Sequence, residues 1–390
     1  MTATSLFRYF VTAGLINAAL FAFLLFTRKR NNTTSILLIC FMLLVSFQAL
    51  LNAFDTREFF LTLPHLSRIS WLQLSLFGPL IYLFTKKITD GGQRLTWKDA
   101  LHILPFLFYL VILSPWLLQS AATKRKFLMD FDGLSRLDFG WLNQLSLCMI
   151  TGYLLLSLSL LRKFRKRVEN ALSDISNYRL VWLRQFIYGI LGILIVSAMG
   201  FYGRKWQIPV ITHFYHYNYF LVVGMVYWLA AKYLLQPEIF GAGKIGPTTS
   251  KKYQKSGLQA PAEKTIYEKL LDRMTAERPF LDPDLTIFTL AEQLQVSRHH
   301  LSQAINEQAG KSFHDFVNTY RVEAVKRRLE DPASAEYTIL GIAMDCGFNS
   351  KATFNTTFKK LTGTTPSAYQ KACKKTFNPA GPVDTTLSPI

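Results

Sequence analysis

Seven apolar segments occupy most of the first 236 residues, and they restrict the fold more than any other feature of the sequence. A helix needs roughly 20 predominantly apolar residues to cross about 30 Å of hydrocarbon. The segments run approximately over Tyr9–Phe26, Ile36–Phe54, Ile69–Phe84, Leu101–Leu118, Trp141–Leu161, Phe186–Phe201 and Phe214–Leu235. We therefore expect an all-α chain whose first part, residues 1–236, is a polytopic bundle of about seven membrane spans, with six or eight as alternatives.

Lys and Arg between these segments predict the orientation of the bundle, because cytoplasmic connections are enriched in both. The cluster Arg28-Lys29-Arg30 follows the first segment and favours an N-terminus outside the cell. Seven spans then place the C-terminus in the cytoplasm. The cluster Lys124-Arg125-Lys126 is discordant, since it falls on the outer side. We expect a multi-pass protein of the bacterial inner (cytoplasmic) membrane with a cytoplasmic C-terminal domain.

Polar side chains inside the apolar segments predict contacts between helices. In lipid such groups face neighbouring helices, where they can form hydrogen bonds. The alternative is that they line a ligand cavity. The residues concerned are Asn17, Gln48, Asn52, Gln73, Asn143 and Gln144.

The formal charge of +19 suggests a nucleic-acid partner, but its distribution removes that inference. Residues 1–261 contain 28 Lys and Arg against 10 Asp and Glu, a net of +18. Residues 262–376 contain 16 against 14, a net of only +2. The basic character therefore belongs to the membrane part, and any case for DNA binding must rest on local motifs.

The C-terminal part contains a pair of short helices around Gly347 that predicts a helix-turn-helix at about 338–360. Ile339, Ile342 and Ala343 form one apolar stripe. Gly347 breaks that helix, and Asn349 and Ser350 are both good N-cap types for the next. The buried face of the second helix is expected at Phe354, Phe358 and Leu361.

The same pattern occurs upstream and predicts a first helix-turn-helix at about 286–307. Its first helix buries Ile287, Leu290, Ala291 and Leu294, and its second follows the N-cap Ser297 and buries Leu301 and Ile305. Ser312 and Asp315 resemble a capping box that opens a long connecting helix, which ends at Asp331-Pro332.

Residues that face away from these apolar stripes are the candidate DNA contacts, since the second helix of such a motif enters the major groove. They are small, polar or basic. In the first motif they are Arg298, His299, Ser302, Gln303 and Asn306, and in the second they are Lys351, Ala352, Asn355, Thr356 and Lys359.

Residues 262–372 resemble the DNA-binding domain of AraC/XylS-type transcription regulators. The matching stretches are LAEQLQVSRHHLSQAINEQAGKSFHDFVNTYRVEAVKRRL and IAMDCGFNSKATFNTTFKKLTGTTPSAYQK. The resemblance implies seven helices and two recognition helices on one rigid unit, which read successive major grooves. It also implies base contacts by His299, Ser302 and Gln303, and by Lys351, Ala352 and Thr356.

The remaining sequence supplies a connection and a tail. Residues 237–261 are rich in Gly, Pro, Ser and Lys and lack periodicity, so we expect a flexible linker. Residues 262–376 then form the DNA-binding domain, and residues 377–390 a disordered tail.

No enzyme motif occurs: the sequence has no phosphate loop, nucleophile elbow or paired-carboxylate signature, and its four cysteines lack metal-ligand spacing. We expect no catalytic residue, cofactor or metal. The favoured hypothesis is a membrane-anchored transcription regulator whose spans act as sensor or anchor. Its expected partners are double-stranded DNA, the lipid bilayer, a small-molecule or membrane signal, RNA polymerase and a second copy of the chain. The alternative is a transporter or receptor whose C-terminal helices bind a regulatory protein partner.

Overall fold

The computed structural model describes residues 20, 22–23, 33–54, 56–91, 94–130, 141–175, 180–206, 208, 214–235, 260–334 and 336–377. Within them all regular elements are helices, apart from one isolated antiparallel bridge between Leu172 and Thr286. The all-α prediction is therefore confirmed for the described residues. The expected linker and tail lie outside them, except that Ala260, Pro261 and Phe377 are helical.

The chain divides into two compact units, and the division does not follow the sequence order. Unit 1 comprises Met1–Phe164 and Leu180–Thr249. Unit 2 comprises Arg165–Arg179 and Ser250–Ile390. A short internal segment of the membrane part thus belongs to the C-terminal unit, which the sequence did not indicate.

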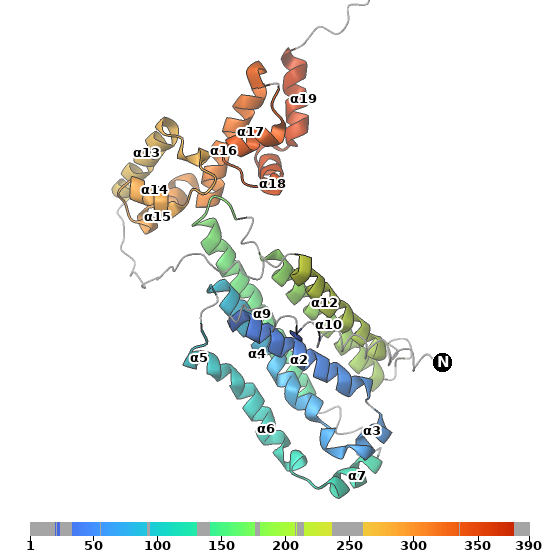
Figure 1. Cartoon of the computed structure of the whole chain (residues 1–390). Helices are drawn as coiled ribbons and strands as arrows, with labels where there is room; N and C mark the ends of the chain where they lie inside the picture. Colours follow the sequence, from blue (N-terminus) through green and yellow to red (C-terminus); the bar gives the residue numbers. More distant parts are fainter. Residues whose placement is uncertain are drawn as a thin grey trace, which may run out of the picture. The chain divides into compact units, whose positions relative to one another are not determined.

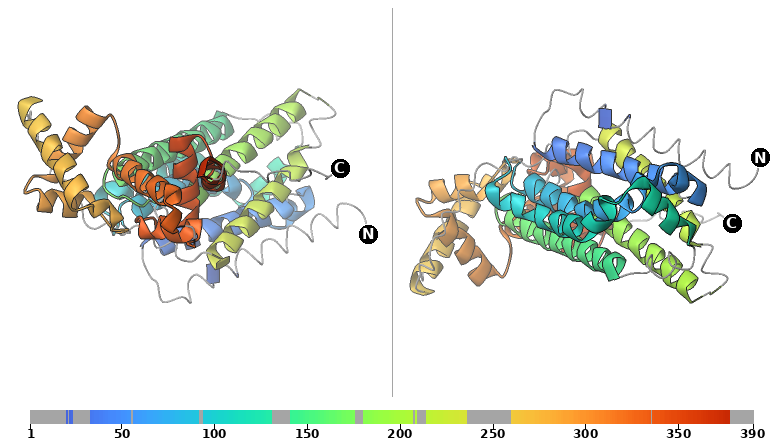
Figure 2. Two further views of the ribbon diagram at one scale, coloured as in Figure 1. Left: turned by 90° about the horizontal axis from the view of Figure 1, so that it is seen from above. Right: turned by 90° about the horizontal axis from the view of Figure 1, so that it is seen from below.

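Unit 1 is built from long helices that run side by side (Figures 1 and 2), with α2 packed on α4, α4 on α6 and α10 on α12. Short helices connect them. The α-helices are α2 (Thr33–Ala53), α3 (Arg57–Thr62), α4 (Ile69–Thr89), α5 (Trp97–Ala100), α6 (Leu104–Leu117), α7 (Ala121–Met129), α9 (Trp141–Glu169), α10 (Val181–Lys205) and α12 (Phe214–Leu235), and the 3₁₀ turns are η1 (Pro64–Leu66) and η2 (Leu101–Ile103). The last five residues of α9 belong to unit 2.

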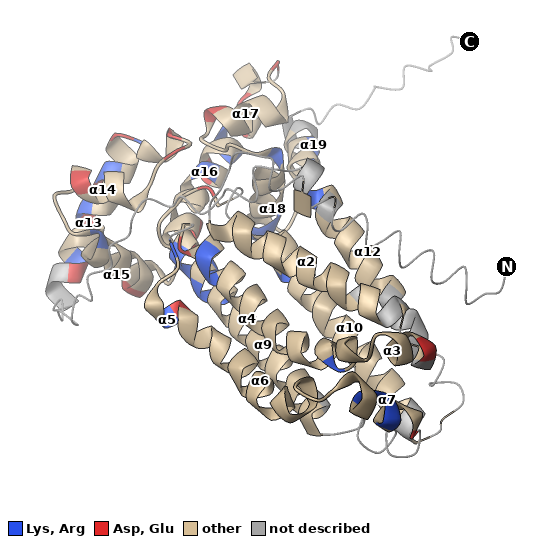
Figure 3. Cartoon of the chain, turned by 60° about the horizontal axis from the view of Figure 1, so that its bottom comes forward, with Lys and Arg blue, Asp and Glu red and all other residues tan. Residues whose placement is uncertain are grey.

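Three described helical stretches are long and apolar enough to cross a membrane: Trp97–Leu117, Gln144–Glu169 and Val181–Gly203. Within the described residues the structure thus supports three of the seven predicted spans. The described apolar parts of α2 and α12 are Thr33–Gln48 and Phe220–Leu229, and α4 carries Lys86 and Lys87 in its last turn. The first predicted span lies outside the described residues, apart from residues 20, 22 and 23. In Figure 3 the long helices of unit 1 are mostly tan along their middle, and the Lys and Arg colour lies mainly toward their ends.

The predicted contacts between helices are confirmed for Gln48, Gln73 and Gln144, whereas Asn17 and the side chains of Asn52 and Asn143 lie outside what the structure describes. Gln73 of α4 donates a hydrogen bond to Gln48 of α2. Tyr202 of α10 donates to Gln144 of α9 at 2.8 Å. Such bonds satisfy groups that lipid cannot solvate, so they fix which helices are neighbours.

Two cations of the discordant basic cluster, which falls on the expected outer side, donate hydrogen bonds to backbone carbonyl groups of unit 1. Lys124 is fully buried, and its Nζ lies 3.0 Å from the Leu117 carbonyl and 3.1 Å from His65 Nδ1. Arg125 Nε donates to the Leu61 carbonyl at 2.9 Å. Burial lowers the pKa of Lys124. Two of the three cations therefore hold α7 against α3, η1 and the end of α6.

Unit 2 contains seven described α-helices. They are α13 (Ala260–Ala276), α14 (Ile287–Gln293), α15 (Arg298–Ala309), α16 (Phe313–Glu330), α17 (Ile339–Asp345), α18 (Lys351–Thr362) and α19 (Pro366–Phe377), with 3₁₀ turns η5 (Pro279–Leu281) and η6 (Pro332–Ser334). Helix α16 begins at the N-cap Ser312, which accepts a hydrogen bond from the Asp315 amide, and ends before Asp331. Both ends of the connecting helix agree with the prediction.

The central helix α16 contributes to two separate hydrophobic cores. Its first half supplies Phe313, Phe316 and Val317 to a core shared with α13, α14 and α15. Its second half supplies Val322, Val325 and Leu329 to a core shared with α17 and α18. One continuous helix therefore carries both motifs.

The turn of the second motif approaches the first core closely at Gly347. This residue has a φ of +91°, which favours glycine. A Cβ at this position would lie no more than 3.0 Å from the carbonyl oxygens of Phe280 and Leu281 and from Arg321 Nε. Glycine is thus required both by the backbone conformation and by the space available.

We expect Gly347→Ala to destabilise unit 2 more than Gly363→Ala does. Both positions have positive φ, which costs an alanine about 1–3 kcal/mol, but a Cβ at Gly363 meets no atom within 4 Å. All seven tryptophans precede residue 250, so fluorescence would report on unit 1. Hydrogen exchange of the α17 and α18 amides is the suitable measurement, and equal effects of the two substitutions would contradict the close approach.

Candidate DNA-binding interface

The two predicted helix-turn-helix motifs have the same backbone geometry in their turns. The left-handed residue is Gln295 in the first turn (φ +56°) and Gly347 in the second (φ +91°). The next amide in each turn bonds back to the first helix: Val296 to the Ala291 carbonyl at 3.0 Å, and Phe348 to the Ala343 carbonyl at 3.1 Å. The motif is therefore present twice in three dimensions as well as in the sequence.

Both second helices begin at the predicted serine N-caps. Ser297 accepts a hydrogen bond from the His300 amide at 3.1 Å, and Ser350 accepts one from the Thr353 amide at 3.3 Å. A side-chain oxygen that satisfies a free amide fixes where a helix starts. The first residues of α15 and α18 are thereby Arg298 and Lys351.

The five predicted contacts on α15 differ in accessibility. His299 and Asn306 are exposed, whereas Arg298, Ser302 and Gln303 are half-buried. The Arg298 guanidinium lies 5.0 Å from the ring centre of Phe288 in α14, a cation–π contact that holds the charge at the helix start. Asn306 bonds back to the Ser302 carbonyl at 2.8 Å.

Gln303 is engaged within the protein. Its Nε2 donates to the carboxylate of Glu263, a buried residue of α13 that lies 40 positions earlier. A base contact by this amide requires the Glu263 bond to break or the other amide atom to be used. Among the five predicted contacts on α15, the exposed ones are therefore His299 and Asn306.

The five predicted contacts on α18 are all exposed: Lys351, Ala352, Asn355, Thr356 and Lys359. On the opposite face Thr353, Phe354, Thr357 and Phe358 are buried. The prediction that Leu361 is buried is wrong, since its exposed fraction is 41%. Tyr369 of α19 packs on Phe358 instead, with ring centres 5.5 Å apart, and covers that side of the core.

One ion pair connects the end of α18 to the start of α16. Lys360 Nζ lies 2.9 Å from Asp315 Oδ1. Burial acts most strongly on the Asp315 carboxyl and raises its pKa, but the hydrogen bond and charge of Lys360 outweigh it, so the pKa lies below its ordinary value. Lys360 is thus occupied, whereas the neighbouring Lys359 has no hydrogen-bond or ion-pair partner among the described residues.

Two contributors to the interface were missed by the sequence reading. Phe288 supports Arg298, and Glu263 holds Gln303. Phe288 is 38% exposed next to a predicted contact, and an aromatic residue at that place could have been noticed. Glu263 gave no signal, because its partner lies far along the chain.

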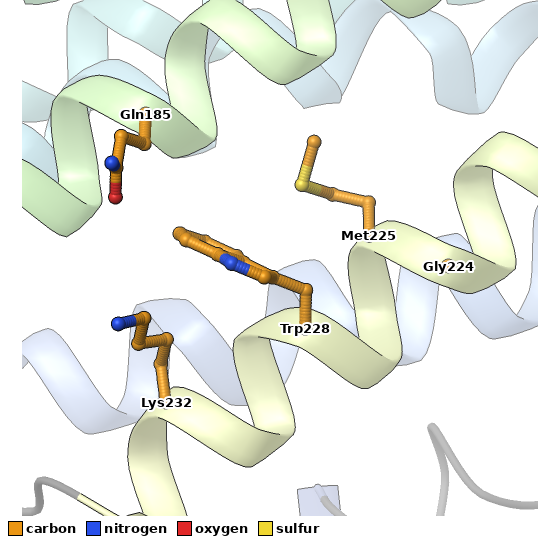
Figure 4. Close-up of a pocket in the computed structure, with 5 residues that line it drawn as sticks. All are labelled: Gln185, Gly224, Met225, Trp228 and Lys232. Carbon is orange, nitrogen blue, oxygen red and sulfur yellow. The ribbon is translucent and has the colours of Figure 1, made fainter.

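A pocket of about 490 Å³ lies in unit 1 between α10 and α12 (Figure 4). It is lined by Gln185, Gly224, Met225, Trp228 and Lys232. One cation, one amide and one indole suit an anionic or amphipathic ligand. Gln48, Gln73 and Gln144, the polar span residues whose side chains the structure describes, do not line this pocket. No group of three or more metal-ligating side chains occurs within the described residues.

The sequence model of a helix-turn-helix domain family matches residues 290–372, the region that carries most of this geometry. Residues 290–372 are a helix-turn-helix domain. An uncharacterised HTH-type transcriptional regulator of Staphylococcus aureus (strain COL) is 40% identical over 87 residues, which are 22% of this chain and 11% of that protein. An HTH-type transcriptional regulator of Mycobacterium tuberculosis is 30% identical over 83 residues, 21% of this chain and 31% of that protein.

A solved structure of a Listeria innocua protein shows 29% identity over 27% of this chain and 96% of its own, with a TM-score of 0.25. The chain spans about a tenth of the length of the S. aureus regulator and about a third of that of the M. tuberculosis regulator. The matching family model lies within unit 2.

Lys359→Ala is expected to lower affinity for every DNA sequence and to reduce the salt dependence of binding by about one phosphate contact. The reason is the exposed ammonium at the end of α18. Lys360→Ala removes the same charge from the next residue, where it already forms an ion pair with Asp315. This substitution should therefore change the salt dependence of DNA binding less. Titrations at several salt concentrations measure both. Identical slopes for wild type and Lys359→Ala would exclude the phosphate contact.

Proposed function

We propose that this protein is a membrane-embedded, sequence-specific regulator of transcription that binds double-stranded DNA through α15 and α18. The observation that carries the proposal is the pair of motifs with equal turns on one continuous helix. Two recognition helices fixed on one helix suit two successive major grooves of one duplex.

The division of roles within the interface follows from the exposed groups. Lys351 at the start of α18 suits a guanine edge, and His299, Asn355 and Thr356 offer further polar contacts. Arg298 and Lys359 suit phosphates, which set affinity but not sequence preference. Because residues 262–376 carry a net charge of only +2, attraction to DNA depends on where these cations lie.

The membrane part is proposed to hold the regulator at the inner membrane and to receive a signal. Three apolar helical stretches of sufficient length support membrane insertion. We place the N-terminus outside and the DNA-binding domain in the cytoplasm, where DNA is available. The pocket between α10 and α12 is a candidate site for a small-molecule or lipid signal.

The full chain in lipid nanodiscs should select a DNA motif from a randomised duplex pool. On the selected DNA sequence, Lys351→Ala should weaken the free energy of binding by about 1–3 kcal/mol and relax the sequence preference at one base pair. Lys371→Ala, which removes one positive charge from α19 outside the two motifs, serves as the control and should keep the preference. Failure of the wild-type chain to enrich any sequence would reject the proposed function.

Reporter fusions should place residues 162–184 and the C-terminus in the cytoplasm, and the N-terminus outside. The expectation follows from the positive charge of residues 162–167 next to the end of an apolar stretch. Fusions after residues 30, 130, 175 and 235 with a periplasm-active and a cytoplasm-active enzyme would measure it. An active periplasmic reporter after residue 235 would contradict the arrangement.

A further inference from the structure

The segment 171–175, here called the clasp, lies between two helices of the membrane part but packs in the DNA-binding unit. Helix α9 ends at Glu169, and α10 begins at Val181. Both contain candidate membrane spans. The clasp is therefore separated from a candidate span by only a few residues on each side.

The clasp pairs with the start of the first motif. The Ile287 amide donates to the Ala171 carbonyl at 3.0 Å, and the Ser173 amide donates to the Leu285 carbonyl at 3.3 Å. These bonds flank the bridge between Leu172 and Thr286, the N-cap of α14. The clasp thus pairs through this single antiparallel bridge with the loop that precedes the motif.

Ser173 is the centre of the second set of contacts. It is 1% exposed, and its carbonyl accepts hydrogen bonds from Asn318 at 3.1 Å and from His314 Nδ1 at 2.7 Å, both on α16. Its hydroxyl donates to the Leu285 carbonyl at 2.7 Å and accepts from Arg321 at 3.0 Å. A single serine therefore connects the clasp to three side chains of the central helix.

Arg321 extends the contact to the second motif. Its guanidinium donates to the carbonyls of Phe280 at 2.8 Å and Asp282 at 2.7 Å. It also lies 5.9 Å from the ring centre of Phe348, in the turn of the second motif. Through Ser173, the clasp consequently contacts Arg321, the residue that lies between the two motifs.

Beyond α9, the hydrogen bonds given above for Ala171 and Ser173 of the clasp go to residues 285–287 and to α16, not to the predicted DNA contacts on α15 and α18. An inhibitory segment would cover a recognition face. The clasp instead supports the framework behind both faces.

We propose that the clasp couples the membrane helices to DNA binding. When the clasp is docked, it holds the two motifs in the arrangement that one duplex requires. When α9 and α10 move and withdraw the clasp, the arrangement of the two motifs becomes less ordered and the affinity for DNA falls. A framework ordered before binding loses less freedom on binding. This inference rests on the proposed function, and it assigns the signal a path other than the linker at residues 237–261.

The test compares full-length variants in nanodiscs on the duplex that the wild-type chain selects. Ser173→Ala removes the hydroxyl that serves Arg321 and should weaken DNA binding about tenfold, since a buried donor loses its partner. Ser173→Arg places a large second cation beside Arg321 and should release the clasp fully. Thr275→Ala removes an exposed hydroxyl that bonds only within α13 and should leave affinity unchanged. Hydrogen exchange at the Ile287 amide reports docking in each variant.

The outcomes separate the two proposals. Absence of DNA selection by wild type rejects the proposed function. Wild-type affinity in Ser173→Arg, with rapid exchange at Ile287, overturns the coupling. Loss of protection throughout α16, α17 and α18 in Ser173→Ala also overturns it, because the segment is then a structural part of the domain. Reduced affinity with fast exchange confined to residues 171–175 and 285–287 is the expected result.

Discussion

The buried guanidinium of Arg321 is the interaction on which the C-terminal unit depends. The side chain is 1% exposed, and a charge in such a place is costly unless its donors are satisfied. Burial lowers its pKa to about 10, so the group stays protonated near neutral pH. Its partners come from the loop before α14 and from the clasp. Both must be in place for the charge to be satisfied.

The position of Arg321 along α16 explains why one residue has this influence. The helix buries Val317 in the first core and Val322 in the second, and Arg321 lies between them. Gly347 leaves space for the guanidinium on the side of the second motif. A change at this point therefore reaches both recognition helices, although neither contains any of the atoms that bind the guanidinium.

The parts of the fold that could be predicted are those encoded by neighbouring residues. Ser297 and Ser350 cap helices through amides three residues away, and Gly347 supplies a backbone angle that other residues avoid. Periodicity placed Phe354 and Phe358 inside the core. It failed at Leu361, because Tyr369 of α19 fills the adjacent space. Of the seven predicted spans, three are candidate spans in the described part of the chain, and the first lies almost entirely outside it.

The parts that could not be predicted depend on residues far apart in the chain. Gln303 has the polarity of a base-reading residue, but Glu263 holds its amide. Ser173 lies in a polar connection without periodicity, and its partner Arg321 is 148 residues away. No local sequence pattern predicts a contact between two such distant residues. Only the fold brings the two together.

The membership of residues 165–179 in the C-terminal unit constrains the path of the chain between them. This segment and residues 250–390 form one compact body, so both must lie on the same side of any membrane. The intervening residues 180–249 then cross the bilayer an even number of times. If α10 crosses it, a second passage must return the chain, and α12 is the described helix available for it. Helix α12 spans 22 residues, Phe214–Leu235, the range over which the sequence predicts the last span, so the parity of the crossings and the hydropathy point to the same return passage.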